Sequence, residues 1–237
     1  MPPGTGSSGS AGCSVRVTHV PSPNHDDRPD GAPVDMLILH YTGMRSGAAA
    51  IDRLCDPAAK VSAHYVVEED GQVFRLVPEA RRAWHAGMSH WRGASGLNAR
   101  SIGIEVVNPG HEHGYRPFAA LQMAALCDLC LGVLARHPIP AWNVVGHSDV
   151  APDRKEDPGE FFDWEGLAAH GVGLWPRAPG RDDGDALGLL RAIGYRTDLP
   201  LPVLLRAFQR HWRPGCVDGV ADAETLARLH AVAAAAR

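Results

Sequence analysis

The sequence lacks two features that would point to a membrane or to nucleic acid. It has no run of about eighteen apolar residues, the length needed to cross a bilayer, so we expect no transmembrane segment. It also lacks an excess of basic residues, because 27 acidic side chains outnumber 23 basic ones and give a formal net charge of −4. This balance gives no indication of nucleic-acid binding. The residues likewise indicate no obligate protein partner.

Cysteine is scarce and odd in number. The chain has 5 cysteines, so at least one is unpaired within it, and 237 residues are enough to bury a core without disulfides. Cys127 and Cys130 are spaced as Cys-x-x-Cys, but they lie in an expected helix and no second pair accompanies them. Two small buried residues on one helical face are favoured over a redox or metal function.

The beginning of the chain lacks the signature of an export signal. Residues 1–12 are rich in Pro, Gly and Ser, without a basic start or an apolar centre, and we expect residues 1–14 to be a disordered tail. The segment from Ser10 to Cys13 is similar to a lipoprotein cleavage site without its hydrophobic stretch. The chain as given is therefore expected in the cytoplasm, or in the periplasm or at the outer membrane if an export signal has been removed.

The most informative stretch that is present is GHSDVAPDRKEDPG, residues 146–159. It follows an apolar run that predicts the end of a short buried strand, and its prolines predict an irregular loop. His147 and Asp157 are residue types that bind zinc, and Lys155 projects to the same side as Asp157 in an extended loop. The alternative is a solvated, charged loop.

His40 is the candidate for a third metal ligand. It ends the apolar run of a strand expected at 34–40, and a zinc hydrolase takes three protein ligands and leaves a fourth position for water. A hydrogen-bonded histidine at a strand end is the alternative.

Glu105 lies in the middle of an apolar strand expected at 101–107. An unpaired carboxylate among apolar side chains is costly, so this group must face solvent, pair with an arginine or serve chemistry.

Aromatic rings stand among glycines in a segment that begins at Trp84 and His85 and continues through Trp91. Indole and imidazole rings at this irregular spacing suit a loop that presents flat faces to a sugar or peptide ligand. For Trp91 the alternative is a ring that pins the loop to the body of the protein. Asn98 is the last polar member of this group.

Five segments, in order, carry a resemblance to a known family. They are VPSPNHDDRPDG, LILHYTG, VSAHYVVEEDGQVFRLVPE, RRAWHAGMSHWRGASGLNARSIGIEVVN and GHSDVAPDRKEDPG, and they extend from about Val20 to about Trp175. In these segments the chain resembles the zinc-dependent N-acetylmuramoyl-L-alanine amidases of the amidase-2 family, relatives of the peptidoglycan recognition proteins, and most of all the bacterial muropeptide amidases. Beyond them, FQRHWRPGCVDGVADAETLARL resembles a small three-helix peptidoglycan-binding module; the alternative is a helical extension that only stabilises the fold.

The resemblance implies an α/β fold with a mixed central sheet flanked by helices, followed by a small all-α module. We expect a zinc amidase domain at 15–176, a linker at 177–185 and a helical peptidoglycan-binding-like domain at 186–237. The long helix is expected at 118–136, and the last three at 186–193, 203–212 and 222–235. The buried face of the long helix is expected to carry Phe118, Leu121, Gln122, Ala125, Leu129 and Val133.

The resemblance also implies a site. Zn²⁺ would be held by His40, His147 and Asp157, with Glu105 as general base and Lys155 stabilising the oxyanion. Substrate contacts would come from Tyr41, Trp84, His85, Trp91 and Asn98, although Ala99 stands where the family often has Asp. The substrate would be peptidoglycan or soluble muropeptides, cut between N-acetylmuramic acid, or its 1,6-anhydro form, and L-alanine in cell-wall recycling or remodelling. Rival hypotheses are a non-catalytic peptidoglycan-binding protein and a zinc hydrolase of another amide.

Overall fold

A computed structural model describes residues 16–177 and 180–237 of the chain. The tail predicted at 1–14 and part of the predicted linker lie outside these residues. Within the described ranges, no helix has the length and apolar character needed to cross a bilayer.

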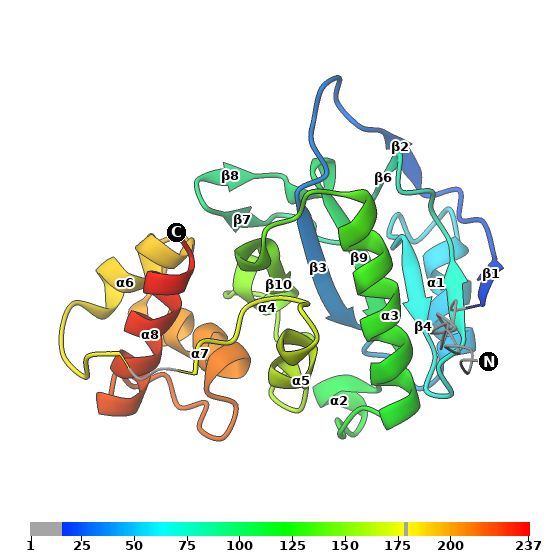
Figure 1. The fold of residues 1–237 in the computed structure, drawn as a ribbon. Coiled ribbons are helices and arrows are strands. Elements are labelled where there is room, and N and C mark those ends of the chain that lie inside the picture. The colour runs from blue at the N-terminus through cyan, green and yellow to red at the C-terminus, as the bar shows by residue number, and fades with distance from the viewer. Residues whose placement is uncertain (1–15, 178–179) are drawn as a thin grey trace, which may run out of the picture.

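A six-stranded mixed sheet forms the centre of the molecule (Figure 1), with strand order β1-β5-β4-β9-β3-β10. Its strands are β1 (Val17–His19), β3 (Met36–Tyr41), β4 (Tyr65–Val67), β5 (Val73–Arg75), β9 (Ser101–Val106) and β10 (Val144–Gly146). β4 and β5 form an antiparallel hairpin around Asp70-Gly71, a dipeptide typical of hairpin turns, and the other neighbours are parallel. Smaller pairs are β2 (His25–Asp27) with β6 (Arg81–Ala83) and β7 (His90–Trp91) with β8 (Ala94–Ser95). The predicted mixed α/β fold is confirmed.

Successive side chains of β3 pack into different hydrophobic clusters, because a strand turns alternate residues to opposite faces. Leu37 and Leu39 belong to the cluster beneath α3 (Ala120–Arg136) and α5 (Trp164–Ala169). Met36 and Ile38 belong to a second cluster, which includes residues of the last three helices. The continuous apolar run of β3 thus follows from burial on both faces.

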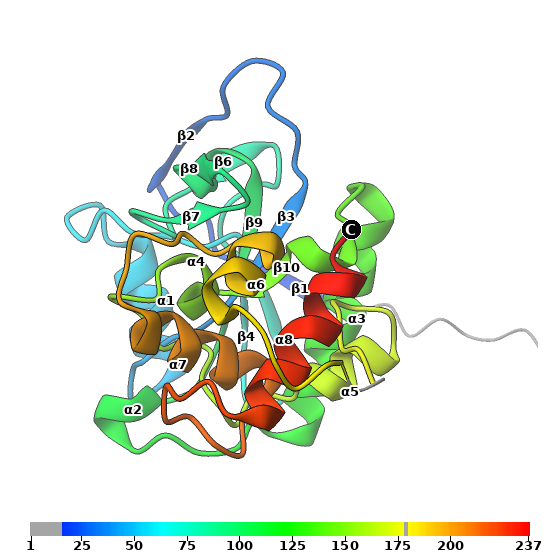
Figure 2. The same ribbon diagram turned by 90° about the vertical axis from the view of Figure 1, so that its left-hand side faces the viewer.

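The last three helices gather on one side of the sheet (Figure 2). They are α6 (Ala186–Ile193), α7 (Leu201–Trp212) and α8 (Ala223–Ala235), and the side chains of Asp185 and Asp222 cap α6 and α8. Leu190 and Phe208 of this helical module share one buried cluster with Ile38 of the sheet. The module therefore packs directly on the α/β part of the chain.

The remaining helical segments are short and lie at the ends of strands or in connections. They are α1 (Gly47–Cys55), α2 (Gly110–His113), α4 (His147–Val150), and the 3-10 turns at Leu97–Ala99 and Ala141–Asn143.

The long helix α3 buries part of its predicted face. Gln122, Leu129 and Val133 are buried as expected, but Leu121 is 69% exposed, so its placement on that face was wrong. The buried residues are Gln122, Leu126, Leu129, Cys130 and Val133. Gln122 fits this stripe because its side-chain amide donates to the carbonyls of Val67 and Val107, where β4 and β9 end. Burial raises the pKa of the Cys130 thiol, which suits a packing residue rather than a reactive one.

The segment after β10 is more regular than predicted. His147 to Val150 forms the short helix α4, although Pro152 and Pro158 predicted an irregular loop throughout. The first of these prolines comes after the helix has ended. In addition, the Asp149 carboxylate accepts a hydrogen bond from the backbone N–H of Gly146, which stabilises the first turn.

Asp149 also joins the two parts of the chain. Tyr195 Oη donates to its Oδ1 at 2.5 Å, and His211 Nδ1 lies 2.7 Å from its Oδ2. All three residues are buried. The imidazole of His211 is stacked between the indoles of Trp164 and Trp212. This buried polar contact, called here the Asp149 clasp (Asp149, Tyr195 and His211), ties the helical module to the helix that begins at His147.

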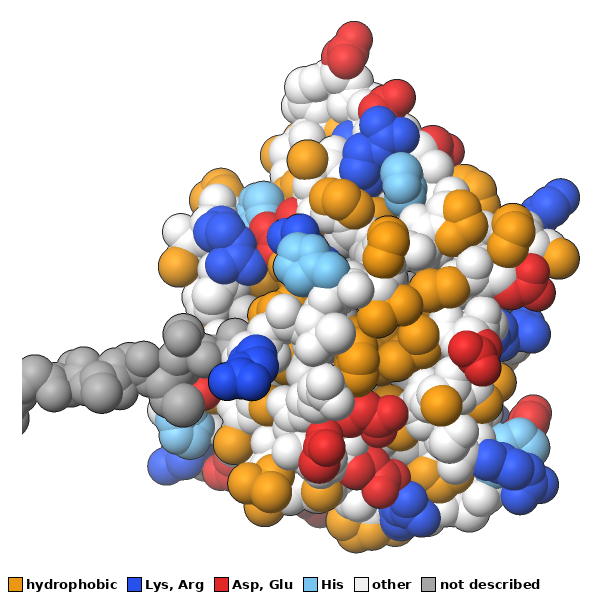
Figure 3. Space-filling view, turned by 90° about the vertical axis from the view of Figure 1, so that its right-hand side faces the viewer, with side chains coloured by type: hydrophobic (Ala, Val, Ile, Leu, Met, Phe, Trp, Pro, Cys, Tyr) orange, Lys and Arg blue, Asp and Glu red, His pale blue; other side chains and the backbone are white. Residues whose placement is uncertain are grey.

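The face of the molecule opposite the module has a mixed surface. Acidic and basic side chains are interspersed with apolar ones in the view of Figure 3.

We expect Tyr195→Phe to lower the free energy of unfolding by about 1–3 kcal/mol, because it leaves a buried carboxylate oxygen of Asp149 without its hydroxyl partner. The measurement is the midpoint of chemical denaturation by circular dichroism. Thr197→Val, which alters a hydroxyl nearby but outside the clasp, is the control. Equal midpoints for Tyr195→Phe and the parent would show that the clasp does not stabilise the fold.

Candidate active site

The register of three parallel strands brings the predicted site residues together. Gly146 of β10 pairs with Leu39 of β3, so the next residues along the two strands, His147 and His40, come side by side. On the other side, His40 pairs with Glu105 of β9. Carboxyl ends of parallel strands meet at one edge of a sheet, where ligands of α/β proteins commonly bind.

His40, His147 and Asp157 converge on one buried point. His40 Nδ1 lies 3.0 Å from His147 Nδ1 and 2.9 Å from Asp157 Oδ2, and His147 Nδ1 lies 3.1 Å from Asp157 Oδ2. All three residues are buried, and they form a group whose geometry could hold a metal ion. We call this group the ligand triad.

The chemistry of the ligand triad fits a cation. His147 Nε2 lies 3.1 Å from the carbonyl oxygen of Ala86, which only accepts hydrogen bonds, so Nε2 carries the proton. In the neutral ring, Nδ1 then directs a lone pair toward the other two residues, and the Asp157 carboxylate likewise only accepts. Acceptor atoms this close in a buried place repel unless a positive charge lies between them. Two imidazoles and one carboxylate are a donor set that Zn²⁺ uses in hydrolases, with a fourth position left for water.

The pKa values of His40 and Asp157 favour metal binding. Burial, together with the neighbouring His147, lowers the pKa of His40 to about 4, so its imidazole is neutral at pH 7. Burial alone would raise the pKa of Asp157, but the charge and hydrogen bonds that His147 and His40 supply when protonated outweigh it and hold that pKa well below its usual range; with neutral rings, a bound cation would supply the positive charge instead. Neutral imidazoles and an ionised carboxylate are the forms that ligate metals.

The loop that carries two of the ligands is closed on itself. The backbone N–H of Ser148 donates to the carbonyl of Asp157 at 2.8 Å, and the N–H of Lys155 donates to the carbonyl of Ala151 at 3.0 Å. These bonds fold residues 147–157 back, so that Asp157 lies beside His147 and Lys155 lines the cleft above them.

Glu105 is an unpaired carboxyl group at this site. Its Oε2 atom is buried and has no hydrogen-bond partner among the described residues. Burial, and next the charge of Asp157, raise its pKa well above the ordinary value, while Lys155 opposes the shift. Among the described residues no arginine pairs with Glu105, and the half-buried side chain lines the cleft rather than the outer surface. A carboxyl group with a shifted pKa in a cleft is a candidate for chemistry there.

A cleft of about 670 Å³ opens over the ligand triad. Of the predicted substrate-contacting residues, Tyr41, Trp84 and His85 line it, as do Glu105 and Lys155. Burial, and next the charge of Asp157, raise the pKa of Tyr41 to about 12, so its hydroxyl stays protonated.

The structure does not bring Trp91 and Asn98 into this cleft. Trp91 is 1% exposed, packs edge-on against Tyr195 of the helical module and donates from its indole N–H to the carbonyl of Trp142. Its large apolar ring gains more from this burial than from a position in water. The side-chain oxygen of Asn98 instead accepts from the backbone N–H groups of His85 and Ala86.

Several residues at the cleft were missed by the sequence analysis. His111, Glu112 and His113 of α2 line its mouth, and Arg154 forms part of its wall. Arg154 donates to the carbonyls of Ala86 and Met88. It thereby connects the loop that follows Trp84 and His85 to the loop of residues 147–157. In the sequence, Arg154 is one of several charges in a polar segment, and nothing local distinguishes it.

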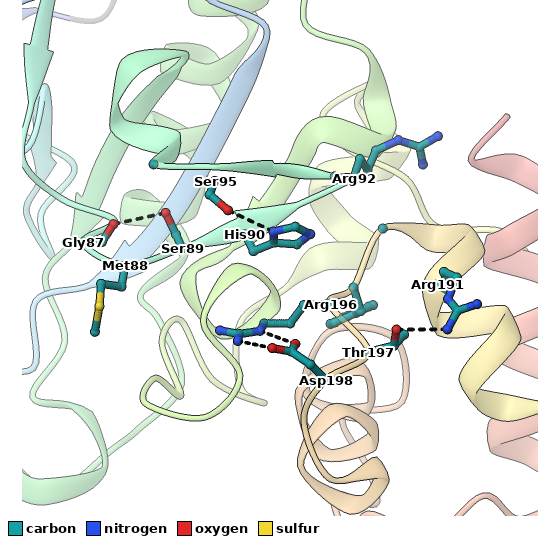
Figure 4. A pocket seen from close by; sticks show the side chains of 14 residues that line it. Gly87, Met88, Ser89, His90, Arg92, Ser95, Arg191, Arg196, Thr197 and Asp198 are labelled. Atoms are coloured by element: carbon teal, nitrogen blue, oxygen red, sulfur yellow. Dashed lines mark hydrogen bonds and ion pairs between the residues drawn. The ribbon is translucent and has the colours of Figure 1, made fainter.

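A second hollow, of about 830 Å³, lies between the β7–β8 hairpin and the segment after α6 (Figure 4). It is larger than the cleft but contains no member of the ligand triad. Its arginines are already engaged, since Arg196 pairs with Asp198 and Arg191 donates to Thr197.

Taken together, a mixed sheet, a buried His/His/Asp triad at its carboxyl edge and a free carboxyl group beside it define a metal-dependent hydrolase. Residues 30–160 match the family model described as N-acetylmuramoyl-L-alanine amidase. The chain belongs to this family.

Individual relatives agree with this assignment. The chain is 38% identical over 229 residues to the N-acetylmuramoyl-L-alanine amidase AmiD of Escherichia coli, covering 84% of this chain and 82% of that protein. It is 36% identical over 170 residues to the 1,6-anhydro-N-acetylmuramyl-L-alanine amidase AmpD of Enterobacter cloacae, covering 65% of this chain and 89% of that protein.

A solved structure is similar over nearly the whole fold. The complex of E. coli AmiD with anhydro-N-acetylmuramic acid-L-Ala-D-γ-Glu-L-Lys has a TM-score of 0.76 and 37% identity, covering 86% of this chain and 91% of that one. The similarity confirms the predicted family and fold.

We expect Asp157→Ala to lower the zinc bound per chain well below that of the parent protein, because it removes the only charged member of the ligand triad. The measurement is metal analysis after dialysis against buffered zinc. Asp153→Ala, an exposed aspartate of the same loop, is the matched control and should keep the parental stoichiometry. Full zinc occupancy in Asp157→Ala would rule out Asp157 as a ligand.

Proposed function

We propose that the protein is a zinc-dependent amidase that cuts the bond between the lactyl carbonyl of N-acetylmuramic acid and the L-alanine of a peptidoglycan stem peptide. The observation that carries this proposal is the ligand triad with the unpaired Glu105 carboxyl beside it in an open cleft. The substrates are peptidoglycan or soluble muropeptides. The muropeptide bound in the similar AmiD structure supports this substrate class.

In this proposal, His40, His147 and Asp157 hold the metal. Zn²⁺ bound there supplies a Lewis acid that lowers the pKa of a water from about 16 to about 7. The donor set of two imidazole nitrogens and one carboxylate oxygen suits zinc better than Mg²⁺ or Ca²⁺, which prefer oxygen ligands alone.

Glu105 moves the proton. As general base it takes a proton from the attacking water and then delivers it to the nitrogen of the departing L-alanine. Its raised pKa suits this function, because a carboxyl group of ordinary acidity holds a proton too weakly near neutral pH.

Lys155 stabilises the charge that develops on the carbonyl oxygen. Its ammonium group lines the cleft two residues from Asp157, on a loop fixed by backbone hydrogen bonds. A fixed positive charge in a partly dry cleft stabilises an oxyanion more than the same charge does in water. We assign Tyr41 and Trp84, which line the same cleft, to contacts with the sugar or the peptide.

The helical module is proposed to bind peptidoglycan in addition to packing on the sheet. Its likeness to peptidoglycan-binding modules supports this. Peptidoglycan binding is measured by sedimentation of the full-length protein with purified sacculi.

The decisive experiment is a digest of purified muropeptides in both the ordinary and the 1,6-anhydro form, read by mass spectrometry. We expect free stem peptide to be released, to cease with a chelator and to return when Zn²⁺ is added. The two sugar forms then show which substrate is preferred. Tight retention of muropeptide without release would instead identify a binding protein, and release from unrelated amides would identify a broader hydrolase.

Two variants separate the proposed functions of Glu105 and Lys155. Lys155→Ala should keep its zinc and lose roughly 10²- to 10³-fold in kcat, because one oxyanion-stabilising group is gone. In the parent, activity should rise with pH as Glu105 deprotonates, through a pKa above that of an ordinary carboxyl group, and Glu105→Gln should abolish this acid limb together with most turnover. Parental turnover in either variant would remove that residue from the mechanism.

A further inference from the structure

His85 contacts His40 at the ring nitrogen that faces away from the other two members of the ligand triad. Its Nδ1 lies 3.0 Å from His40 Nε2, on the opposite side of the His40 ring from the triad. The other nitrogen of His85, Nε2, lies 3.1 Å from the hydroxyl oxygen of Ser101, and this hydroxyl lies 2.7 Å from the carbonyl oxygen of Leu97. These contacts form one continuous chain of hydrogen bonds from Leu97 to His40.

The direction of every bond in this chain follows from its far end. The carbonyl of Leu97 only accepts, so the single proton of the Ser101 hydroxyl is donated to it. Ser101 Oγ must therefore accept from His85 Nε2–H. A neutral His85 protonated at Nε2 has a lone pair at Nδ1, which in turn must accept from His40 Nε2–H. His40 Nδ1 is then left unprotonated and faces the triad.

We propose that His85 and Ser101 are positioning residues that fix the tautomer and the ring orientation of His40, so that its Nδ1 lone pair is presented to the metal. This inference rests on the proposed metal-binding function of His40. It assigns to His85 a function in holding the metal ligand, whereas the sequence predicted a substrate contact.

The surroundings of His85 are arranged to keep its ring in place. A Cβ atom at Gly103 would lie 2.4 Å from the His85 ring, so only glycine allows the ring to pack against β9 at this point. The backbone N–H of His85 donates to the side-chain oxygen of Asn98. Ser101, Gly103 and Glu105 are alternate residues of β9 and therefore project from the same face.

The contacts of His85 match a neutral ring. Among the described residues its two nitrogens contact only His40 and the Ser101 hydroxyl, and no carboxylate is present to stabilise a charged ring. A doubly protonated ring would donate from both nitrogens and would force the proton of His40 onto Nδ1, where it would block the metal.

The proposal predicts that breaking the chain weakens metal binding without removing a ligand. Without Ser101 as acceptor, His85 no longer has a preferred tautomer, and His40 spends part of its time with a proton on Nδ1. Loss of a hydrogen-bond partner behind a metal-ligating histidine typically costs about 10- to 100-fold in metal affinity.

The experiment compares Ser101→Ala and His85→Leu with the parent. Ser89→Ala is the matched control, because Ser89 is a nearby buried serine whose hydroxyl bonds Gly87 and Leu97 but does not touch His85. The zinc dissociation constant is measured by competition with a chromophoric chelator. Nitrogen-15 NMR of the imidazoles in the metal-free protein reports which nitrogen of His40 carries the proton.

We expect the dissociation constant to rise about 10-fold or more for Ser101→Ala and His85→Leu, and to stay parental for Ser89→Ala. The parent should show His40 protonated at Nε2, and Ser101→Ala should show a mixture. If Ser101→Ala binds zinc as tightly as the parent, or if His40 in the metal-free parent carries its proton on Nδ1, the proposal is wrong. Failure of the parent itself to bind zinc would instead overturn the proposed function.

Discussion

The mutual approach of three acceptor atoms is the constraint on which the rest of the site depends. His40, His147 and Asp157 bring two nitrogens and one oxygen within 3.1 Å of one another in a buried place. Without a cation these three atoms repel one another, so the surrounding structure has to hold the three side chains in place. The parallel register of β10, β3 and β9, the closed loop after β10 and the hydrogen bonds behind both imidazoles each supply part of that enforcement.

The two carboxyl groups of the site lie in one environment but are suited to two functions. Asp157 is buried and Glu105 is half-buried at the cleft, and their pKa values shift in opposite directions. Asp157 lies against the imidazoles and stays ionised, whereas Glu105 has no partner and is pushed toward the protonated form. Groups whose environments drive their pKa values apart are suited to different tasks, here holding a cation and exchanging a proton.

Much of the fold and of the candidate site could be predicted from the sequence, where local pattern and tertiary structure agree. The apolar run before His40 predicts a central strand, and the Asp70-Gly71 turn predicts the β4–β5 hairpin. The predictions that failed concern side chains whose position depends on residues far away in the sequence. Trp91 is buried because helices a hundred residues later cover it. Leu121 is exposed because the buried stripe of α3 includes Leu126 and Cys130, a rotation that depends on what the helix packs against. Ser101 could not be singled out, because its function depends on His85, which reaches it only in the folded chain.

The cluster shared by the sheet and the last three helices has a consequence for how the chain matures on the ribosome. All three members of the ligand triad have been synthesised by residue 157, yet one side of β3 and β10, and the indole of Trp91, still lack their cover at that stage. Leu190, Phe208 and Leu229, which complete the cluster, are made after residue 157. Domains made first ordinarily fold first during synthesis. In this protein, by contrast, part of the core of the α/β domain is supplied by residues that follow the whole ligand triad in the order of synthesis.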